Sequence, residues 1–236
     1  MPSNATPAHT PLTGISSMAT RQLLSELTAA YAERSGRAVA IASVGGVDAA
    51  KRVQAGEAFD VVILASDAIA KLVASGHLRA DSVVDLVHSG VAVAVRADTP
   101  VPDISSEDAV RQAVLAAPTI SYSTGPSGVA LAKLFERWGI AEQIKNRIVT
   151  APPGVPVGSL VAKGEVALGF QQLSELIHVD GITIVGPLPH AIQITTTFSA
   201  AMTTGCTRPA QVQALLGFMV SPEAAEAKRR QGMEPA

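Results

Sequence analysis

Short apolar runs and longer amphipathic segments alternate along the chain. Runs such as residues 60–66 and 91–96 are shorter than an ordinary helix and are typical of buried strands. Between such runs, apolar residues recur at helical spacing, as Leu23 and Leu27 do before Gly36 ends their segment. Strands that alternate with helices predict an α/β fold with largely parallel strands.

The same reading gives the elements we expect from the pattern. Strands are predicted at residues 38–43, 60–66, 91–96, 119–123, 166–170 and 191–200. Helices are predicted at residues 18–35, 45–55, 67–74, 107–116, 129–138, 156–163, 211–220 and 222–230. The proline-rich residues 99–102 follow a predicted strand at once and indicate a crossing between two units.

Two strands run into a turn, rich in serine and glycine, that opens a helix. Ser16 and Ser17 lie in the first turn, and Ser123 and Ser127 lie in the second, within residues 121–128. The first turn of a helix has N–H groups without partners and the positive end of the helix dipole, so it attracts anions. Two such turns that face one cleft would bind a small anion. The alternative is that these serines are ordinary helix caps.

Composition excludes several classes of function. The net charge of −2 and an aromatic content of 3% give neither a basic stripe nor a stacking platform for nucleic acid. Cys206 is the only cysteine and the five histidines are isolated, so we expect no metal site, and no cofactor fingerprint is recognisable. The longest apolar runs fall short of the ~18 residues that span a bilayer, so we expect no membrane insertion.

The first eleven residues have no basic start followed by an apolar stretch, which are the marks of a secretory signal. We therefore expect a cytoplasmic protein, or a periplasmic one if a leader was removed from the sequence given.

The chain resembles the type II periplasmic-binding-protein fold and, within it, the molybdate-binding-protein branch. The resemblance rests on the order and spacing of its segments, which are the Ser16-Ser17 turn and residues 45–53, 59–67, 126–128, 164–169, 221–224 and 234–235. It implies a two-lobed α/β fold in which each lobe is a mixed, mostly parallel sheet flanked by helices. Residues 1–95, with residues 196–236 returning, would form the first lobe, and residues 96–195 the second.

The resemblance also implies where a ligand would bind. Gly45 and Gly46 stand where the family has a serine hydroxyl, and Gln171 and Gln172 replace a tyrosine-bearing stretch. Ala65, at the end of an apolar strand, completes the expected substrate-binding set. These exchanges favour a larger or flatter ligand, with carbonyl and hydroxyl groups, over molybdate. The alternatives are a tight turn for the glycines and a polar helix start for the glutamines, of which only one can face the cleft if the strand alternation continues.

Aconitate isomerase, which interconverts trans- and cis-aconitate, is similar to this branch. The resemblance thus implies an intracellular isomerase that binds a small anionic carboxylate and shifts an allylic proton. The alternative is the solute-binding protein of an ABC importer for a molybdate-like oxyanion or small carboxylate, with a permease as its partner. A ligand-sensing domain is a third hypothesis, weakened because no DNA-binding segment is recognisable.

The residues that would move the proton stay unassigned at this point. General acid–base chemistry needs a group that removes a proton from carbon and one that returns it. The candidates are Asp48, Lys51, His88, Glu175 and His190. Arg21, one turn after Ser17, is a candidate for pairing with a substrate carboxylate.

Overall fold

The computed structural model describes residues 10–152 and 154–236. Its strands are β1 (Leu12–Ser17), β2 (Val39–Val44), β3 (Val61–Ala65), β4 (Val84–Arg96), β5 (Ile120–Tyr122), β6 (Leu168–Gln172), β7 (Ile182–Pro187), β8 (Thr195–Met202) and β9 (Met233–Pro235). Its α-helices are α1 (Arg21–Ser35), α2 (Gly46–Gln54), α3 (Ser66–Ala74), α4 (Glu107–Ala116), α5 (Pro126–Arg137), α6 (Ala141–Ile144), α7 (Val157–Ala162), α8 (Leu173–Leu176), α9 (Pro209–Met219) and α10 (Ala225–Arg230). Short 3₁₀ turns include η1 (Met18–Thr20) and η4 (His190–Ile192).

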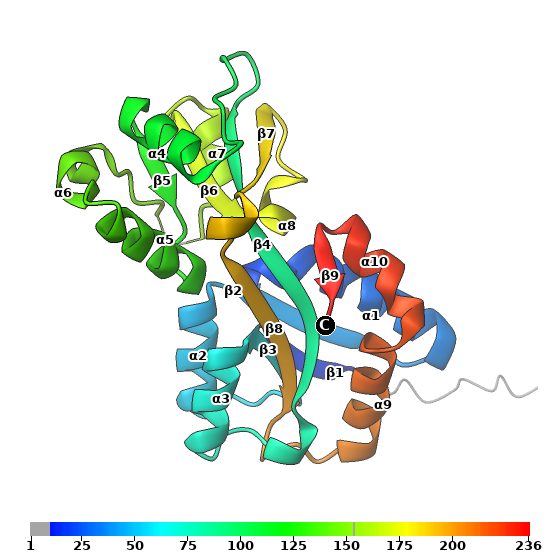
Figure 1. Ribbon diagram of the computed structural model, residues 1–236. Helices are drawn as coiled ribbons and strands as arrows, with labels where there is room; N and C mark the ends of the chain where they lie inside the picture. Colours follow the sequence, from blue (N-terminus) through cyan, green and yellow to red (C-terminus); the bar gives the residue numbers. More distant parts are fainter. Residues whose placement is uncertain (1–9, 153) are drawn as a thin grey trace, which may run out of the picture.

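The strands form one continuous curved sheet in the order β2-β1-β3-β8-β4-β6-β5, with β7 and β9 added at β4 (Figure 1). β1 pairs in parallel with β2 and β3, and β5 pairs in parallel with β6. Every antiparallel ladder in the described chain involves β4 or β8. Successive strands joined by a helix usually pair in parallel. Because β4 and β8 pair antiparallel with their neighbours, the sheet is mixed.

β4 is the strand that connects the two parts of the molecule. Its first half pairs with β8, from Val84 opposite Ala200 to Gly90 opposite Thr195. Its second half, from Val91, pairs with β6 and β7. The prediction that residues 99–102 make the crossing is therefore wrong, because the backbone ladder of β4 itself passes from one group of strands to the other.

Helices cover both faces of the sheet in each part. In the first part, α1, α9 and α10 pack on one face of β1 and β3, and α2 and α3 pack on the other. In the second part, α4, α5 and α6 cover one face, and α7 and α8 cover the other. These separate cores confirm the two-lobed α/β architecture, whereas the lobe boundaries at residues 95 and 195 stay a prediction.

Local sequence explains several element ends. Gly36 adopts a left-handed conformation, with φ of 69°, and ends α1 as the pattern predicts. The predicted strand 166–170 lies instead at Leu168–Gln172, and the predicted strand 191–200 begins only at Thr195, after η4.

No helix in residues 10–152 and 154–236 combines the length and the apolarity that crossing a bilayer requires.

Candidate functional site

Predicted contact residues gather at one edge of the first lobe's sheet. β1, β2 and β3 run in parallel, so their carboxyl ends meet at this edge. Ser17 ends β1, Gly45 and Gly46 lead from β2 into α2, and Ala65 leads from β3 into α3. A methyl group placed on Gly46 would lie 3.8 Å from Ser17 Oγ, in ordinary contact. We call this group of residues the first edge.

The adjacent residues Ser16 and Ser17 differ in what their hydroxyl groups bind. Ser16 is fully buried, and its Oγ lies 2.8 Å from Ser43 Oγ on the neighbouring strand. Ser17 is half-buried, and its Oγ accepts a long hydrogen bond of 3.4 Å from the Ala19 amide, so it also caps η1. Ser17 is thus the serine with hydroxyl capacity left for a ligand, whereas the hydroxyl of Ser16 is occupied within the sheet.

The second predicted turn lies between β5 and α5. Ser123 Oγ and Ser127 Oγ lie 3.0 Å apart, and Ser127 is buried. A methyl group placed on Gly128 would lie 1.6 Å from the Ser123 carbonyl oxygen. Only glycine allows this close approach, and the approach holds the two serine hydroxyls together. We call residues 123–128 the second edge.

The helices that start at these edges have N-cap residues without a side-chain oxygen. Gly45 caps α2, Ala65 caps α3 and Gly125 caps α5, and none of these caps makes a side-chain hydrogen bond. A Ser, Thr, Asp or Asn at such a position would bind the first N–H groups of its helix. Here those N–H groups keep their capacity to bind an anion.

The two glutamines are the last residues of β6 and lie on opposite faces of the sheet. Gln171 Oε1 accepts a hydrogen bond of 3.1 Å from the Gly158 amide, and Gln171 Nε2 donates to Glu175 Oε1 over 3.0 Å. The Gln172 amide lies 2.9 Å from Thr196 Oγ1 on β8. With its amide nitrogen turned towards β4, Gln172 also donates to Ser89 Oγ over 2.7 Å. Both side chains are buried, and their role as ligand contacts stays a prediction.

Contacts at the start of α8 tie the two lobes together next to these residues. Ser174 Oγ, buried in α8, donates a hydrogen bond of 2.9 Å to the Ala19 carbonyl oxygen of η1. Ala19 lies two residues after Ser17, and Ser174 lies two residues after Gln172. Figure 1 shows α8 and the carboxyl ends of β5 and β6 directed towards the first lobe. Ser174 was missed in the sequence analysis, although a serine two residues after Gln172 was a signal that could have found it.

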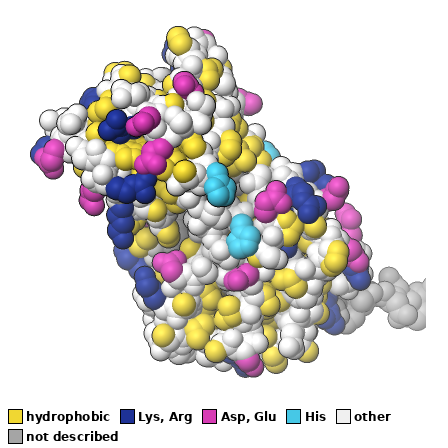
Figure 2. Space-filling view, in the orientation of Figure 1, with side chains coloured by type: hydrophobic (Ala, Val, Ile, Leu, Met, Phe, Trp, Pro, Cys, Tyr) yellow, Lys and Arg dark blue, Asp and Glu magenta, His cyan; other side chains and the backbone are white. Residues whose placement is uncertain are grey.

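Positive side chains border this region on one side. Figure 2, in the orientation of Figure 1, shows Lys and Arg side chains along the margin that carries α5 and α2. Such a margin favours an anionic ligand.

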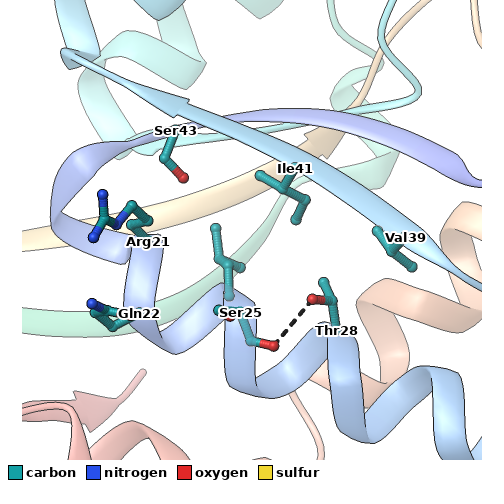
Figure 3. Close-up of a pocket in the computed structure, with 8 residues that line it drawn as sticks. Arg21, Gln22, Ser25, Thr28, Val39, Ile41 and Ser43 are labelled. Carbon is teal, nitrogen blue, oxygen red and sulfur yellow. Dashed lines mark hydrogen bonds between the residues drawn. The ribbon is translucent and has the colours of Figure 1, made fainter.

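Two hollows are formed by other residues. One, of about 430 Å³, lies between α1 and β2 and is lined by Arg21 and Ser43, among others (Figure 3). The other, of about 470 Å³, lies beside Asp60 and Arg208. Neither is lined by Ser17 or Ser127. Arg21, a candidate for pairing with substrate, thus faces the hollow between α1 and β2.

The acid–base candidates differ in their surroundings. Asp48, Lys51 and His190 are exposed, and His88, also exposed, has Nδ1 3.0 Å from Thr197 Oγ1. Glu175 is half-buried in α8. Burial raises the pKa of the Glu175 carboxyl to about 7, and the hydrogen bond from Gln171 offsets only part of that rise.

Within residues 10–152 and 154–236, no group of three or more His, Cys, Asp or Glu side chains is arranged to hold a metal ion.

Comparison with known proteins relates this geometry to function. A family model described as bacterial extracellular solute-binding protein matches residues 12–234. An aconitate isomerase from a Pseudomonas species is 41% identical over 234 residues, which cover 96% of this chain and 88% of that protein.

Solved structures share the fold at low sequence identity. The periplasmic molybdate-binding protein of Azotobacter vinelandii superposes with a TM-score of 0.79 at 21% identity, covering 95% of this chain and 99% of that chain. The sulfate-binding protein SubI of Mycobacterium tuberculosis H37Rv superposes with a TM-score of 0.78 at 17% identity, covering 97% of this chain and 88% of that chain. These likenesses confirm the two-lobed periplasmic-binding-protein fold.

Proposed function

The chain belongs to the family of bacterial extracellular solute-binding proteins, and we propose that it is an isomerase that shifts an allylic proton on a small polycarboxylate of the aconitate type. The observation that carries the proposal is the identity of 41% to an aconitate isomerase over 96% of the chain. An identity of this size over nearly the whole chain extends across both lobes, so it supports more than a shared fold.

The arrangement of donors at the two edges supports the proposed binding of a polycarboxylate. The helix starts of the first edge offer N–H groups and the Ser17 hydroxyl, and the second edge offers N–H groups with the Ser123 and Ser127 hydroxyls. Carboxylates held by such donors bind in the orientation that the donors fix. The same donors stabilise the dienolate charge that develops when a proton leaves the carbon between the carboxylates.

The alternative function is capture of a small oxyanion or carboxylate for an importer. The description of the family model and the likeness to molybdate- and sulfate-binding proteins favour it. A protein with this role would work outside the cytoplasm and contact a permease, whereas the isomerase was expected in the cytoplasm. Cell fractionation with an antibody against the native protein distinguishes the two locations.

Incubation of the purified protein with trans-aconitate tests the main proposal. We expect cis-aconitate to form until the two isomers reach equilibrium. The same final mixture should form from the cis isomer, and proton NMR measures both reactions. A thermal-shift screen with molybdate, sulfate and both aconitates accompanies it, because ligand at ~100 times its Kd stabilises a protein by about 2.7 kcal/mol. Absence of turnover together with stabilisation by molybdate would establish the importer alternative instead.

Serine substitutions at the two edges test where the substrate binds. We expect Ser17→Ala and Ser127→Ala each to raise the KM for trans-aconitate by about 10-fold or more, because a hydrogen bond to a charged group contributes about 1.5–3 kcal/mol. Steady-state kinetics measure the change. Ser75→Ala, which removes an exposed hydroxyl at the end of α3, is the matched control and should leave KM unchanged. Unchanged KM in both edge variants would place the substrate elsewhere.

A further inference from the structure

Glu175 is a half-buried carboxyl group that the proposed carboxylate-binding donors do not include. Glu175 lies in α8, which follows β6 directly. β5 and β6 are parallel neighbours, with Tyr122 opposite Phe170. One step further along the same register, Ser123 follows β5 where Gln171 continues β6. The second edge and the Glu175–Gln171 pair therefore follow adjacent strand ends.

Gln171 fixes the position of the Glu175 carboxyl group. Because the Gly158 amide donates to Gln171 Oε1, the amide nitrogen of Gln171 must be the atom that faces Glu175. It donates to Glu175 Oε1 over 3.0 Å. Among the described residues, Glu175 Oε2 has no hydrogen-bond or ion-pair partner, and the half-buried side chain reaches solvent. One oxygen is thus held in place while the other keeps its capacity to exchange a proton.

Glu175 is also placed beside the contact that joins the lobes. Its neighbour Ser174 binds the Ala19 carbonyl oxygen, two residues after Ser17. Glu175 is therefore the residue next to a contact with the first edge, and its partner Gln171 ends the strand beside the second edge. We expect a substrate held by both edges to be reached by the carboxyl group.

We propose that Glu175 is the catalytic residue that carries the proton in the isomerisation, with Gln171 as the residue that positions it; this inference rests on the proposed function. The Glu175 carboxylate takes a proton from the methylene carbon of trans-aconitate. The electron pair of that C–H bond enters the allylic system, giving a dienolate whose charge the helix starts stabilise. The new carboxylic acid returns the proton to the far carbon of the system. The double bond has then moved by one position, and Glu175 is again a carboxylate.

The electrostatic surroundings suit a group that both accepts and donates a proton. A carboxyl whose pKa lies at about 7 is present in both forms near neutral pH. The elements packed against α8 are β4, β6, β7, α7, η1 and the turn between α10 and β9. Their titratable residues are Asp85, His88 and Arg96 on β4, Glu226, Lys228, Arg229 and Arg230 on α10, and Glu234 on β9. None of these pairs with Glu175. The proton affinity of Glu175 is therefore set by burial and by Gln171.

Glu175→Gln is the direct test. We expect kcat for trans-aconitate to fall by at least about 100-fold, because general acid–base catalysis contributes about 10²- to 10⁴-fold. The Kd for trans-aconitate, measured by calorimetry, should stay within about threefold of the wild-type value, since the lost step is chemical and not binding. Glu136→Gln, on the exposed face of α5, is the matched control and should keep full activity.

Glu175→Asp keeps the proposal testable if the glutamine variant does not fold. For the wild-type protein, kcat/KM should rise as the pH increases through about 7, because the carboxylate form accepts the proton. The shorter side chain loses the contact with Gln171, so this limb of the pH profile should move and kcat should fall. If the wild type turns over trans-aconitate, an unchanged kcat in Glu175→Gln would overturn the role of Glu175 and leave the isomerase function intact. An unmoved pH limb in Glu175→Asp would do the same. Absence of wild-type turnover would remove the isomerase function, and the role of Glu175 with it.

Discussion

Gly128→Ala is expected to abolish carboxylate binding and to destabilise the second lobe. The new methyl group would lie 1.6 Å from the Ser123 carbonyl oxygen and 2.7 Å from its carbonyl carbon. Both are backbone atoms, so no side-chain rotation relieves the clash, and the turn from β5 into α5 must open. Overpacking of a close-packed region costs about 1–3 kcal/mol of stability. Because this clash involves backbone atoms at short distance, we expect a loss of about 3 kcal/mol or more.

Opening the turn also separates the two hydroxyls that define the second edge. Ser123 Oγ and Ser127 Oγ lie 3.0 Å apart only while the backbone of residue 123 stays against Gly128. Urea unfolding and thermal shift with trans-aconitate measure the two consequences separately. The matched control is Gly217→Ala in α9, where a methyl group meets nothing within 4 Å. That variant should gain about 0.5–1 kcal/mol from the higher helix propensity of alanine. A Gly128→Ala protein with wild-type stability and binding would show that the turn accommodates a side chain.

Asp60→Asn is expected to destabilise the first lobe by about 3–5 kcal/mol, because it breaks a buried ion pair and leaves one partner uncompensated. Asp60 is 6% exposed, and its Oδ2 accepts hydrogen bonds from the Thr13 amide over 2.8 Å and from Arg208 Nη2 over 2.6 Å. Arg208 in turn donates to the carbonyl oxygens of Thr10 and Pro11. The pair therefore ties the start of β1 to the residue before β3 and to the segment before α9.

The pH dependence of stability checks the same interaction. Burial by itself raises the pKa of Asp60, but the hydrogen bonds from the Thr13 amide and from Arg208 outweigh it and hold the pKa below its usual value. The stabilisation is therefore present above the pKa of the unfolded chain and is lost as the pH falls through the lower folded value. Urea unfolding at about pH 7 and about pH 3 should show a smaller loss on acidification for Asp60→Asn than for the wild type.

An exposed ion pair provides the control for this substitution. Asp67→Asn removes the carboxylate that faces Lys71 at 3.7 Å on the surface of α3. Such pairs contribute about 0–1 kcal/mol, so this variant should unfold close to the wild type. An Asp60→Asn protein that loses no more than Asp67→Asn would contradict the role given to the buried pair.

The sequence predicted which types of residue form the candidate site, but only part of how these residues are arranged in space. The family resemblance placed Ser17, Gly45 and Gly46 in one substrate-binding set, and the structure brings Ser17 and Gly46 together. The two-residue period of a strand placed Gln171 and Gln172 on opposite faces. The distinction between Ser16 and Ser17 depended on the hydroxyl of Ser43, which is distant in sequence.

The course of β4 was the main part of the fold that local pattern did not give. Polar residues such as His88 and Ser89 interrupt its first half, so only residues 91–96 were predicted as a strand. Pairing with β8 supplies the hydrogen bonds that hold these polar residues in an extended backbone. Tertiary contacts therefore outweighed local composition there.

By itself, the sequence determined the alternation of strands and helices and the serine and glycine turns, because periodicity and turn chemistry act over a few residues. The tertiary structure alone decided that β4 joins the lobes, that Gly128 lies against the Ser123 carbonyl, and that the Gln171 amide faces Glu175. These three depend on contacts between segments whose meeting is set by the whole packed chain, and no local pattern encodes them.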